Sequence, residues 1–337
     1  ICACLVGSEM CIRDRENIEQ RVDLTLFSEK IQELKDQIAS VIVGQEQTVD
    51  LVLAAILANG HVLIEGVPGV AKTLLARLTA RLIDADFSRI QFTPDLMPSD
   101  VLGTTVFNMK TNDFDFHQGP IFADIVLVDE INRAPAKTQA ALFEVMEERQ
   151  ISIDGTTHKM GELYTILATQ NPVEQEGTYK LPEAQLDRFL MKITMDYPSL
   201  EEEVDILERH HTNASLIKLD DIKPAITKEE LLSLRAFMNQ VFVDRTLLQY
   251  IALIVQQTRT SKAVYLGASP RASVAMLQAS KAYALLQGRD FVTPEDIKFV
   301  APYVLQHRLI LTAEAEMEGY SPVKVTQRLI DKVEVPK

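Results

Sequence analysis

The sequence is poor in cysteine, and its few cysteines are confined to one end. Only three occur among 337 residues, at Cys2, Cys4 and Cys11, so the rest of the chain can hold neither a disulfide framework nor a cysteine metal site. This distribution is typical of proteins from a reducing compartment, and we expect a cytoplasmic location. Long apolar runs are also missing, since no stretch approaches the ~20 residues that a membrane-spanning helix requires. We therefore expect no membrane span.

Basic charge is scarce relative to acidic charge. The chain carries 34 lysines and arginines against 48 aspartates and glutamates, which gives a net charge of −14. Because phosphate contacts supply most non-specific affinity for nucleic acids, such an acidic chain is a poor general nucleic-acid binder, although a local basic patch is compatible with this charge. The six histidines show no metal-ligand spacing.

The first fifteen residues differ from the rest of the chain. They show no periodic pattern, and residues 5–14 (LVGSEMCIRD) resemble a read-through translation of a common sequencing-library transposase adapter. We interpret residues 1–15 as a non-native tail, and a genuine disordered terminus is the alternative.

A loop suited to a nucleoside triphosphate follows the apolar run at 62–64. Glycines allow its backbone to turn N–H groups toward an anion, and the helix after it adds partial positive charge. Lys72 can reach the terminal phosphates, and the Thr73 hydroxyl can ligate Mg²⁺. Ala71 replaces the usual glycine, at a position that we expect to lie in the first helical turn and to tolerate alanine. A Gly/Pro turn between a strand and a helix is the alternative. The loop comprises Gly66, Val67, Pro68, Gly69, Val70, Ala71, Lys72 and Thr73, and Leu74 follows it.

Runs at 62–64, 90–92, 125–128, 164–169 and 191–195 predict strands. Because these strands alternate with helical patterns, they predict a three-layer αβα domain. The unbroken run at 125–128 indicates a strand buried on both faces of a parallel sheet. After Pro198 the strand signals stop and helix-capping signals take over, which predicts an all-helical domain. The predicted helix starts are Thr227, Asp244, Ser269 and Thr293. We place the first domain at 16–200 and the second at 201–337.

Two hairpins are predicted within the first domain. Proline and glycine break any long helix within about 93–119, where two short strands flank a turn at 111–113. We expect this insertion to project from the core as a hairpin. A second hairpin is predicted at 151–160, around the turn Asp154-Gly155.

Asp129 and Glu130 follow the buried strand at 125–128. Parallel sheets bind ligands at the carboxyl ends of their strands. Phosphate chemistry needs one carboxylate to hold hydrated Mg²⁺ and another to orient the attacking water, and we assign these roles to Asp129 and Glu130 respectively. Alone, the pair is more typical of a strand that ends in a solvated turn, but the phosphate loop reverses that preference.

Three further polar residues are candidates for the same chemistry. Asn171 can hydrogen-bond a water or the γ-phosphate, or it is a turn asparagine before a proline. Arg188 suits the charge that develops during phosphoryl transfer, or it pairs on the surface with Asp187 or Glu183. Arg271 lies in the first turn of a predicted helix, where a cation is unfavourable unless an anion binds, and an ordinary exposed arginine is the alternative.

Together these motifs resemble the AAA+ ATPases, and more closely the MoxR-type family. The resemblance covers residues 26–330 and includes the alanine at position 71, which is typical of this group. It rests on Val43-Gly44-Gln45, GVPGVAKT at 66–73, IVLVDEINRAPAKTQAALFEVMEE at 125–148, ATQNPVEQEGTYKLPEAQLDRF at 168–189 and GASPRAS at 267–273.

The resemblance implies a three-layer αβα P-loop NTPase core with a C-terminal all-helical lid, and a role for each candidate residue. The hairpin at 101–118 matches the helix-2 insert and that at 151–160 the pre-sensor hairpin. The implied roles are Walker A for Lys72 and Thr73, Walker B for Asp129 and Glu130, sensor 1 for Asn171, arginine finger for Arg188, sensor 2 for Arg271, and adenine contact for Val43 and Gly44.

The resemblance also implies ATP and Mg²⁺ as cofactors and a ring hexamer with each nucleotide at a subunit boundary. We expect ATP between core and lid, where Lys72, Asn171 and Arg271 hold the γ-phosphate and a neighbour supplies Arg188. Family members act as chaperone-like remodellers, often with partners that carry von Willebrand factor A domains. The alternatives are a nucleic-acid motor and a nucleotide-gated scaffold with little turnover.

Overall fold

A five-stranded parallel sheet forms the centre of the protein, with the strand order β2–β5–β8–β1–β9. The computed structural model describes residues 24–172, 179–212 and 222–335, so the expected tail at 1–15 lies outside the described residues. The sequence predicts all five strands, although β2 begins at Phe87 rather than at the expected Ile90. The strands are β1 (Val62–Gly66), β2 (Phe87–Gln91), β5 (Ile125–Asp129), β8 (Thr165–Gln170) and β9 (Met191–Met195).

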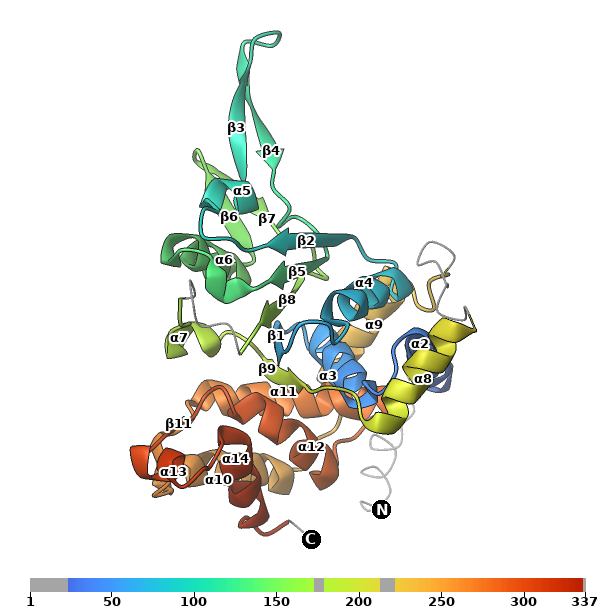
Figure 1. The fold of residues 1–337 in the computed structure, drawn as a ribbon, viewed down its shortest axis with the longest axis vertical. Helices are drawn as coiled ribbons and strands as arrows, with labels where there is room; N and C mark the ends of the chain where they lie inside the picture. Colours follow the sequence, from blue (N-terminus) through green and yellow to red (C-terminus); the bar gives the residue numbers. More distant parts are fainter. Residues whose placement is uncertain (1–23, 173–178, 213–221, 336–337) are drawn as a thin grey trace, which may run out of the picture.

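The sheet is buried on both faces, as the apolar run at 125–128 predicts. Ile125 and Leu127 pack into a core shared with α3 and α4, whereas Val126 and Val128 pack into a second core against α6. This alternation places one helical layer on each face, so the three-layer architecture is confirmed (Figure 1). The covering helices are α2 (Leu24–Val41), α3 (Glu46–Leu57) and α4 (Lys72–Leu82) on one side and α6 (Ala136–Glu148) on the other.

Both predicted hairpins are present. The first, β3 (Gly103–Asn108) with β4 (Asp113–Gln118), projects far beyond the body of the protein (Figure 1). The second pairs β6 (Gln150–Ile153) with β7 (Thr156–Lys159). A short helix that the sequence analysis did not predict, α5 (Pro98–Leu102), precedes β3. Pro98 occupies its first turn, where proline costs no hydrogen bond.

The C-terminal part is helical, and its predicted helix starts are confirmed. Thr227 and Thr293 form capping boxes, and the Asp244 side chain caps α10. The hydrophobic core runs without a break from α3 into α11, which joins the helical part to the sheet. A short helix, α7 (Glu183–Leu186), lies between β8 and β9. The α-helices after the last strand of the sheet are α8 (Leu200–His211), α9 (Lys228–Phe237), α10 (Arg245–Thr260), α11 (Pro270–Leu286), α12 (Pro294–Leu305), α13 (Ala313–Met317) and α14 (Pro322–Asp331).

The expectation that strands stop after Pro198 is wrong in one detail. β10 (Val264–Leu266) pairs antiparallel with β11 (Ile310–Leu311), and this small ladder joins the loops at either end of the α11–α12 pair. Strands of three and two residues are too short to show alternation in the sequence. Within the described ranges, no helix is both long and apolar enough to cross a membrane.

Candidate active site

A cavity of about 380 Å³ lies at the carboxyl edge of the sheet, where β1, β5 and β8 end. Its described lining residues all precede residue 172, so they belong to the core rather than to the helical part. The cavity brings together most of the residues predicted to act there, and adds three that were not predicted. The predicted ones are Pro68, Gly69, Ala71, Lys72, Thr73, Leu74, Asp129, Glu130 and Asn171, and the others are Arg89, Gln91 and Thr169.

The loop between β1 and α4 has the shape of a phosphate cradle. Gly69 adopts φ 90°, and Ala71 adopts φ 61° as the residue that precedes α4. Ala71 is therefore left-handed rather than in the first helical turn as expected, at a cost of about 1–2 kcal/mol that glycine would avoid. A Cβ on Gly66 would lie 2.8 Å from the Met195 carbonyl oxygen, so close packing of β1 on β9 requires glycine there. The Lys72 ammonium donates to the Gly66 carbonyl at 2.5 Å.

The remaining predicted loop residues support the cradle or lie beside it. Val70 is buried and Val67 packs against the same hydrophobic core. Val43 and Gly44 lie between α2 and α3, outside the residues that line the cavity. Gly44 adopts φ 72°, and a Cβ there would lie 2.4 Å from the carboxylate of Glu202 on α8. The segment expected to contact adenine therefore meets α8.

Asp129 is buried at the end of β5, and its carboxylate has two partners. Its Oδ2 pairs with Arg89 Nε at 2.6 Å, and its Oδ1 accepts a hydrogen bond from the Thr169 hydroxyl at 3.0 Å. These contacts fix both oxygens at the rim of the cavity. An aspartate held in this way presents an oxygen ligand of the kind that Mg²⁺ prefers.

Glu130 is the next residue, and its backbone is left-handed with φ 56°. Such a conformation is uncommon outside glycine and is found preferentially at functional sites. Its N–H donates to the Thr169 hydroxyl at 3.0 Å, and its carboxylate accepts from Gln91 at 2.8 Å and pairs with Arg133 at 3.1 Å. Thr169 thus connects Glu130 to Asp129 by a single hydroxyl group.

Three residues at the cavity, Arg89, Gln91 and Thr169, are not predicted as site residues from the sequence. Arg89 and Gln91 point to the same side of β2, and the register opposes Gln91 to Asp129. That pairing depends on β2 lying next to β5, which strand order determines and local sequence does not. The polar alternation Arg89–Ile90–Gln91 was the available signal. The sequence places Thr169 in a strand without a role at the site. Its position near the carboxyl end of β8, two residues before Asn171, was the available signal.

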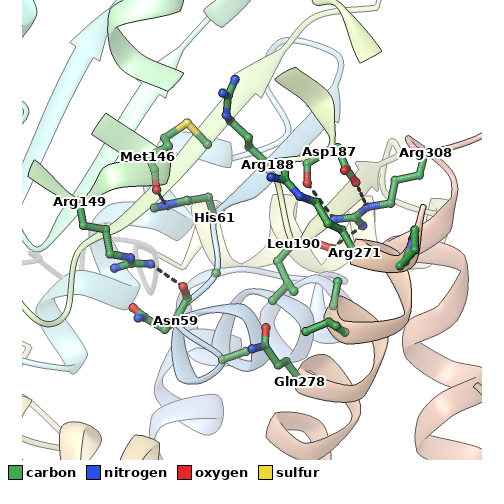
Figure 2. Close-up of a pocket in the computed structure, with 15 residues that line it drawn as sticks. Asn59, His61, Met146, Arg149, Asp187, Arg188, Leu190, Arg271, Gln278 and Arg308 are labelled. Atoms are coloured by element: carbon green, nitrogen blue, oxygen red, sulfur yellow. Dashed lines mark hydrogen bonds and ion pairs between the residues drawn. The ribbon is translucent and has the colours of Figure 1, made fainter. Parts of the chain in front are cut away.

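Arg188 and Arg271 lie together at a different place, beside a cavity of about 510 Å³ shown in Figure 2. Both bind one carboxylate: Arg188 Nε lies 2.6 Å from Glu147 Oε2, and Arg271 Nη2 lies 3.2 Å from Glu147 Oε1. The hydrogen bond and charge of Arg188, followed by the charge of Arg271, lower the pKa of Glu147. Glu147 on α6 thus brings the two arginine side chains together.

This second cavity lies at the amino edge of the sheet, since Gly60 and His61 before β1 line it together with Leu190 before β9. Five residues of β1 separate it from the phosphate loop, roughly 16 Å at ~3.3 Å per residue. The expected grouping of Arg271 with Lys72 in one chain is therefore not what the structure shows. The reason is that α11 packs on α3 with its first turn at this amino edge.

Comparisons with known proteins identify the family and the fold of the chain. A model of the ATPase family associated with various cellular activities (AAA) matches residues 61–191, and a model of the AAA lid domain matches residues 256–331. The chain is 48% identical over 304 residues to the uncharacterized protein YeaC of Bacillus subtilis, across 89% of this chain and 93% of that protein. It is 44% identical over 310 residues to the chaperone MoxR1 of Mycobacterium tuberculosis, across 89% and 81%. A solved structure of a proposed ATPase from Cytophaga hutchinsonii matches with a TM-score of 0.86 and 40% identity, across 97% of this chain and 100% of that one.

Proposed function

The chain belongs to the MoxR-type family of AAA+ ATPases, and from this premise we propose that it hydrolyses ATP to remodel or assemble partner proteins. One observation carries the proposal: Lys72, Thr73, Asp129 and Glu130 converge on a single cavity at the carboxyl edge of the sheet. A cationic phosphate ligand, a hydroxyl and two carboxylates are the parts that nucleoside triphosphate hydrolysis needs. A scaffold with little turnover would not require Glu130 in a strained backbone conformation beside them.

Each residue at the cavity has a distinct task in this proposal. The backbone from Gly66 to Leu74 surrounds the phosphates, and Lys72 leaves the Gly66 carbonyl to bind the terminal ones. The Thr73 hydroxyl and Asp129 supply oxygen ligands for hydrated Mg²⁺, which neutralises charge on the phosphate oxygens when bound. Glu130 orients the attacking water, and Asn171 binds that water or the γ-phosphate. Val43 and Gly44 lie outside the lining of this cavity, and we assign them to the adenine, which would extend beyond the phosphates.

We assign Arg188 and Arg271 to the nucleotide of a neighbouring subunit. Both are roughly a strand length from the phosphate loop of their own chain, which is farther than an arginine side chain reaches. In a ring, which we propose to be a homo-hexamer, the amino edge of the sheet in one subunit would meet the carboxyl edge of the sheet in the next. Exposed ion pairs such as those with Glu147 contribute about 0–1 kcal/mol, so a neighbour's phosphate can displace that carboxylate.

The projecting hairpin is our candidate for the surface that contacts the partner protein. Met109 at its tip is 90% exposed and Phe114 is 67% exposed, and the rings of Phe107 and Phe114 pack edge to face with their centroids 5.2 Å apart. Exposed apolar side chains at the end of an isolated hairpin are typical of an interaction site. The flanking Asp113 and Asp115 disfavour nucleic acid as the partner. A protein with a von Willebrand factor A domain, in the cytoplasm, is the expected class.

The domain division at 16–200 and 201–337 fits this mechanism. A conformational change would then move the helical part relative to a core that holds ATP. The helix-2 insert at about 93–119 would transmit that change to the partner.

Replacement of the water-orienting carboxylate tests the proposal. Glu130→Gln should bind ATP with parent-like affinity and lose steady-state phosphate release, because the amide cannot activate water. Glu144→Gln is the matched control, since Glu144 is exposed on α6 and is not among the residues that line the cavity. Parent-like phosphate release by Glu130→Gln would remove Glu130 from the mechanism.

A further inference from the structure

The turn that follows α12, at residues 306–308, holds the segment that carries Arg188. Arg308 Nε donates to Asp187 Oδ1 at 2.7 Å, and its Nη2 donates to the Phe189 carbonyl at 2.7 Å. Longer bonds of 3.2 Å reach the carbonyls of Asp187 and Leu190, and a further one reaches Val304. The side chain of Arg308 is only 4% exposed. One buried guanidinium therefore contacts the residues on both sides of Arg188.

Two neighbours of Arg308 contact the same segment. His307 Nε2 donates to the Phe189 carbonyl at 3.0 Å, and Gln306 Nε2 donates to the Lys192 carbonyl at 2.5 Å. Burial lowers the pKa of His307, which keeps the ring neutral. Side chains of the helical part thus donate to the carbonyls of Asp187, Phe189, Leu190 and Lys192. These contacts fix the backbone from which Arg188 projects, and Figure 2 shows Arg308 beside Asp187 and Arg188.

Arg271 is connected to the same segment through Ser269. Arg271 lies in the first turn of α11, and Ser269 just before it donates to Asp187 Oδ2 at 3.4 Å. Asp187 therefore accepts from Arg308 on one oxygen and from Ser269 on the other. The positions of Arg188 and Arg271 are both set by contacts with α11 and the end of α12, and the two meet at Glu147.

We propose that Arg308 is a positioning residue that holds Arg188 and Arg271 as one rigid unit for the neighbour's nucleotide. The inference rests on the proposed function. A guanidinium suits this task because its planar fork binds a carboxylate and several carbonyls at once, which a lysine ammonium cannot do with the same geometry. When the helical part moves, Asp187–Leu190 moves with it. Nucleotide-dependent motion in one subunit therefore changes the position of its Arg188 and Arg271 at the nucleotide site of the next subunit.

The test compares Arg308→Met and Arg308→Lys in the full-length oligomer. Both should keep parent-like ATP affinity, because the phosphate loop and Asp129 are untouched. Turnover at saturating ATP should fall about 10²-fold in Arg308→Met, since a misplacement of ~1 Å costs that much. Arg308→Lys preserves a charge beside Asp187 but loses the planar fork of the guanidinium. This variant should therefore fold, but it should turn over ATP more slowly than the parent.

Arg289→Met is the matched control. Arg289 pairs with Asp296 at 2.5 Å and ties α11 to α12 within the helical part, without contact to residues 187–192. It should lower the thermal unfolding midpoint and leave turnover at 25 °C unchanged.

Mixing subunits separates positioning from general damage. Arg308→Met subunits keep a sound nucleotide site, so Lys72→Ala subunits, whose arginines are intact, should restore turnover to the mixture. If Arg308→Met does not fold, Arg308→Lys takes its place in the mixture. Parent-like turnover by folded Arg308→Lys, or no regain on mixing, would overturn the inference. Arg188→Ala measured alongside distinguishes the causes, because retained turnover in that variant refutes the proposed role of Arg188 instead.

Discussion

Thr169 offers a sharp test of how the site is built, because one hydroxyl positions both carboxylates. It donates to Asp129 Oδ1 and accepts from the Glu130 N–H, each at 3.0 Å, and it is 2% exposed. Thr169→Val keeps the shape of the side chain and removes both hydrogen bonds. A hydrogen bond to a charged group contributes about 1.5–3 kcal/mol, which corresponds to roughly 10- to 150-fold in rate if it is lost in the transition state.

Steady-state phosphate release at saturating ATP measures this effect. Thr169→Val should lose turnover in that range, and its free energy of unfolding should fall by about 1–3 kcal/mol because the partly buried Glu130 N–H and the buried Asp129 carboxylate each lose a partner. Thr169→Ser is the control, since it keeps the hydroxyl and loses only a methyl group worth ~0.8 kcal/mol. It should retain most of the turnover. The reasoning is refuted if Thr169→Val and Thr169→Ser hydrolyse ATP equally fast.

Three other predictions follow from contacts at the second cavity and the hairpin. Glu147→Ala removes the carboxylate that competes for Arg188 and Arg271, so the ATP concentration at half-maximal turnover should fall by up to about 5-fold; a rise would show that Glu147 is required to orient the arginines. Burial lowers the pKa of His61 from 6.5 to about 3, so its contribution to stability is complete above pH 6.5 and is lost as the pH falls toward 3. His61→Gln should therefore reduce the slope of unfolding free energy between pH 6.5 and 4.5 by about 1.4 kcal/mol per pH unit, and an unchanged slope would contradict the burial argument. Phe107→Ser with Phe114→Ser should abolish binding of a partner protein in a pull-down while basal turnover stays at the parent level; unimpaired capture would show that the tip is not the contact.

The features that the sequence predicts correctly are those that local pattern determines. The phosphate loop lies between an apolar run and a helical pattern, and Asp129 follows an unbroken apolar run, so both can be located without knowledge of the fold. The strand and hairpin positions follow from runs, alternation and turn residues. Thr227, Asp244 and Thr293 begin helices because their side chains cap free N–H groups, which depends on neighbours within one turn.

The features that it misses depend on how distant elements meet. Arg89 reaches Asp129 only because β2 lies beside β5 in the sheet. Arg271 was expected near the phosphates from its position in a helix, but the packing of α11 on α3 decides which edge of the sheet it faces. The contacts of Arg308 with Asp187 join residues more than a hundred positions apart. The left-handed backbone of Ala71 is not predicted, because the identity of a single non-glycine residue does not determine its φ angle.

The central claim is that each nucleotide site is completed by arginines from the next subunit. Arg188→Ala and Lys72→Ala should each be inactive alone, the first for want of an arginine and the second for want of a phosphate ligand. When the two are mixed in equal amounts and allowed to reassemble, about a quarter of the interfaces will combine an intact Lys72 with an intact Arg188. The account predicts that phosphate release recovers to about that fraction of the parent rate. A mixture as inactive as its two components, with assembly shown by its mass, would contradict it.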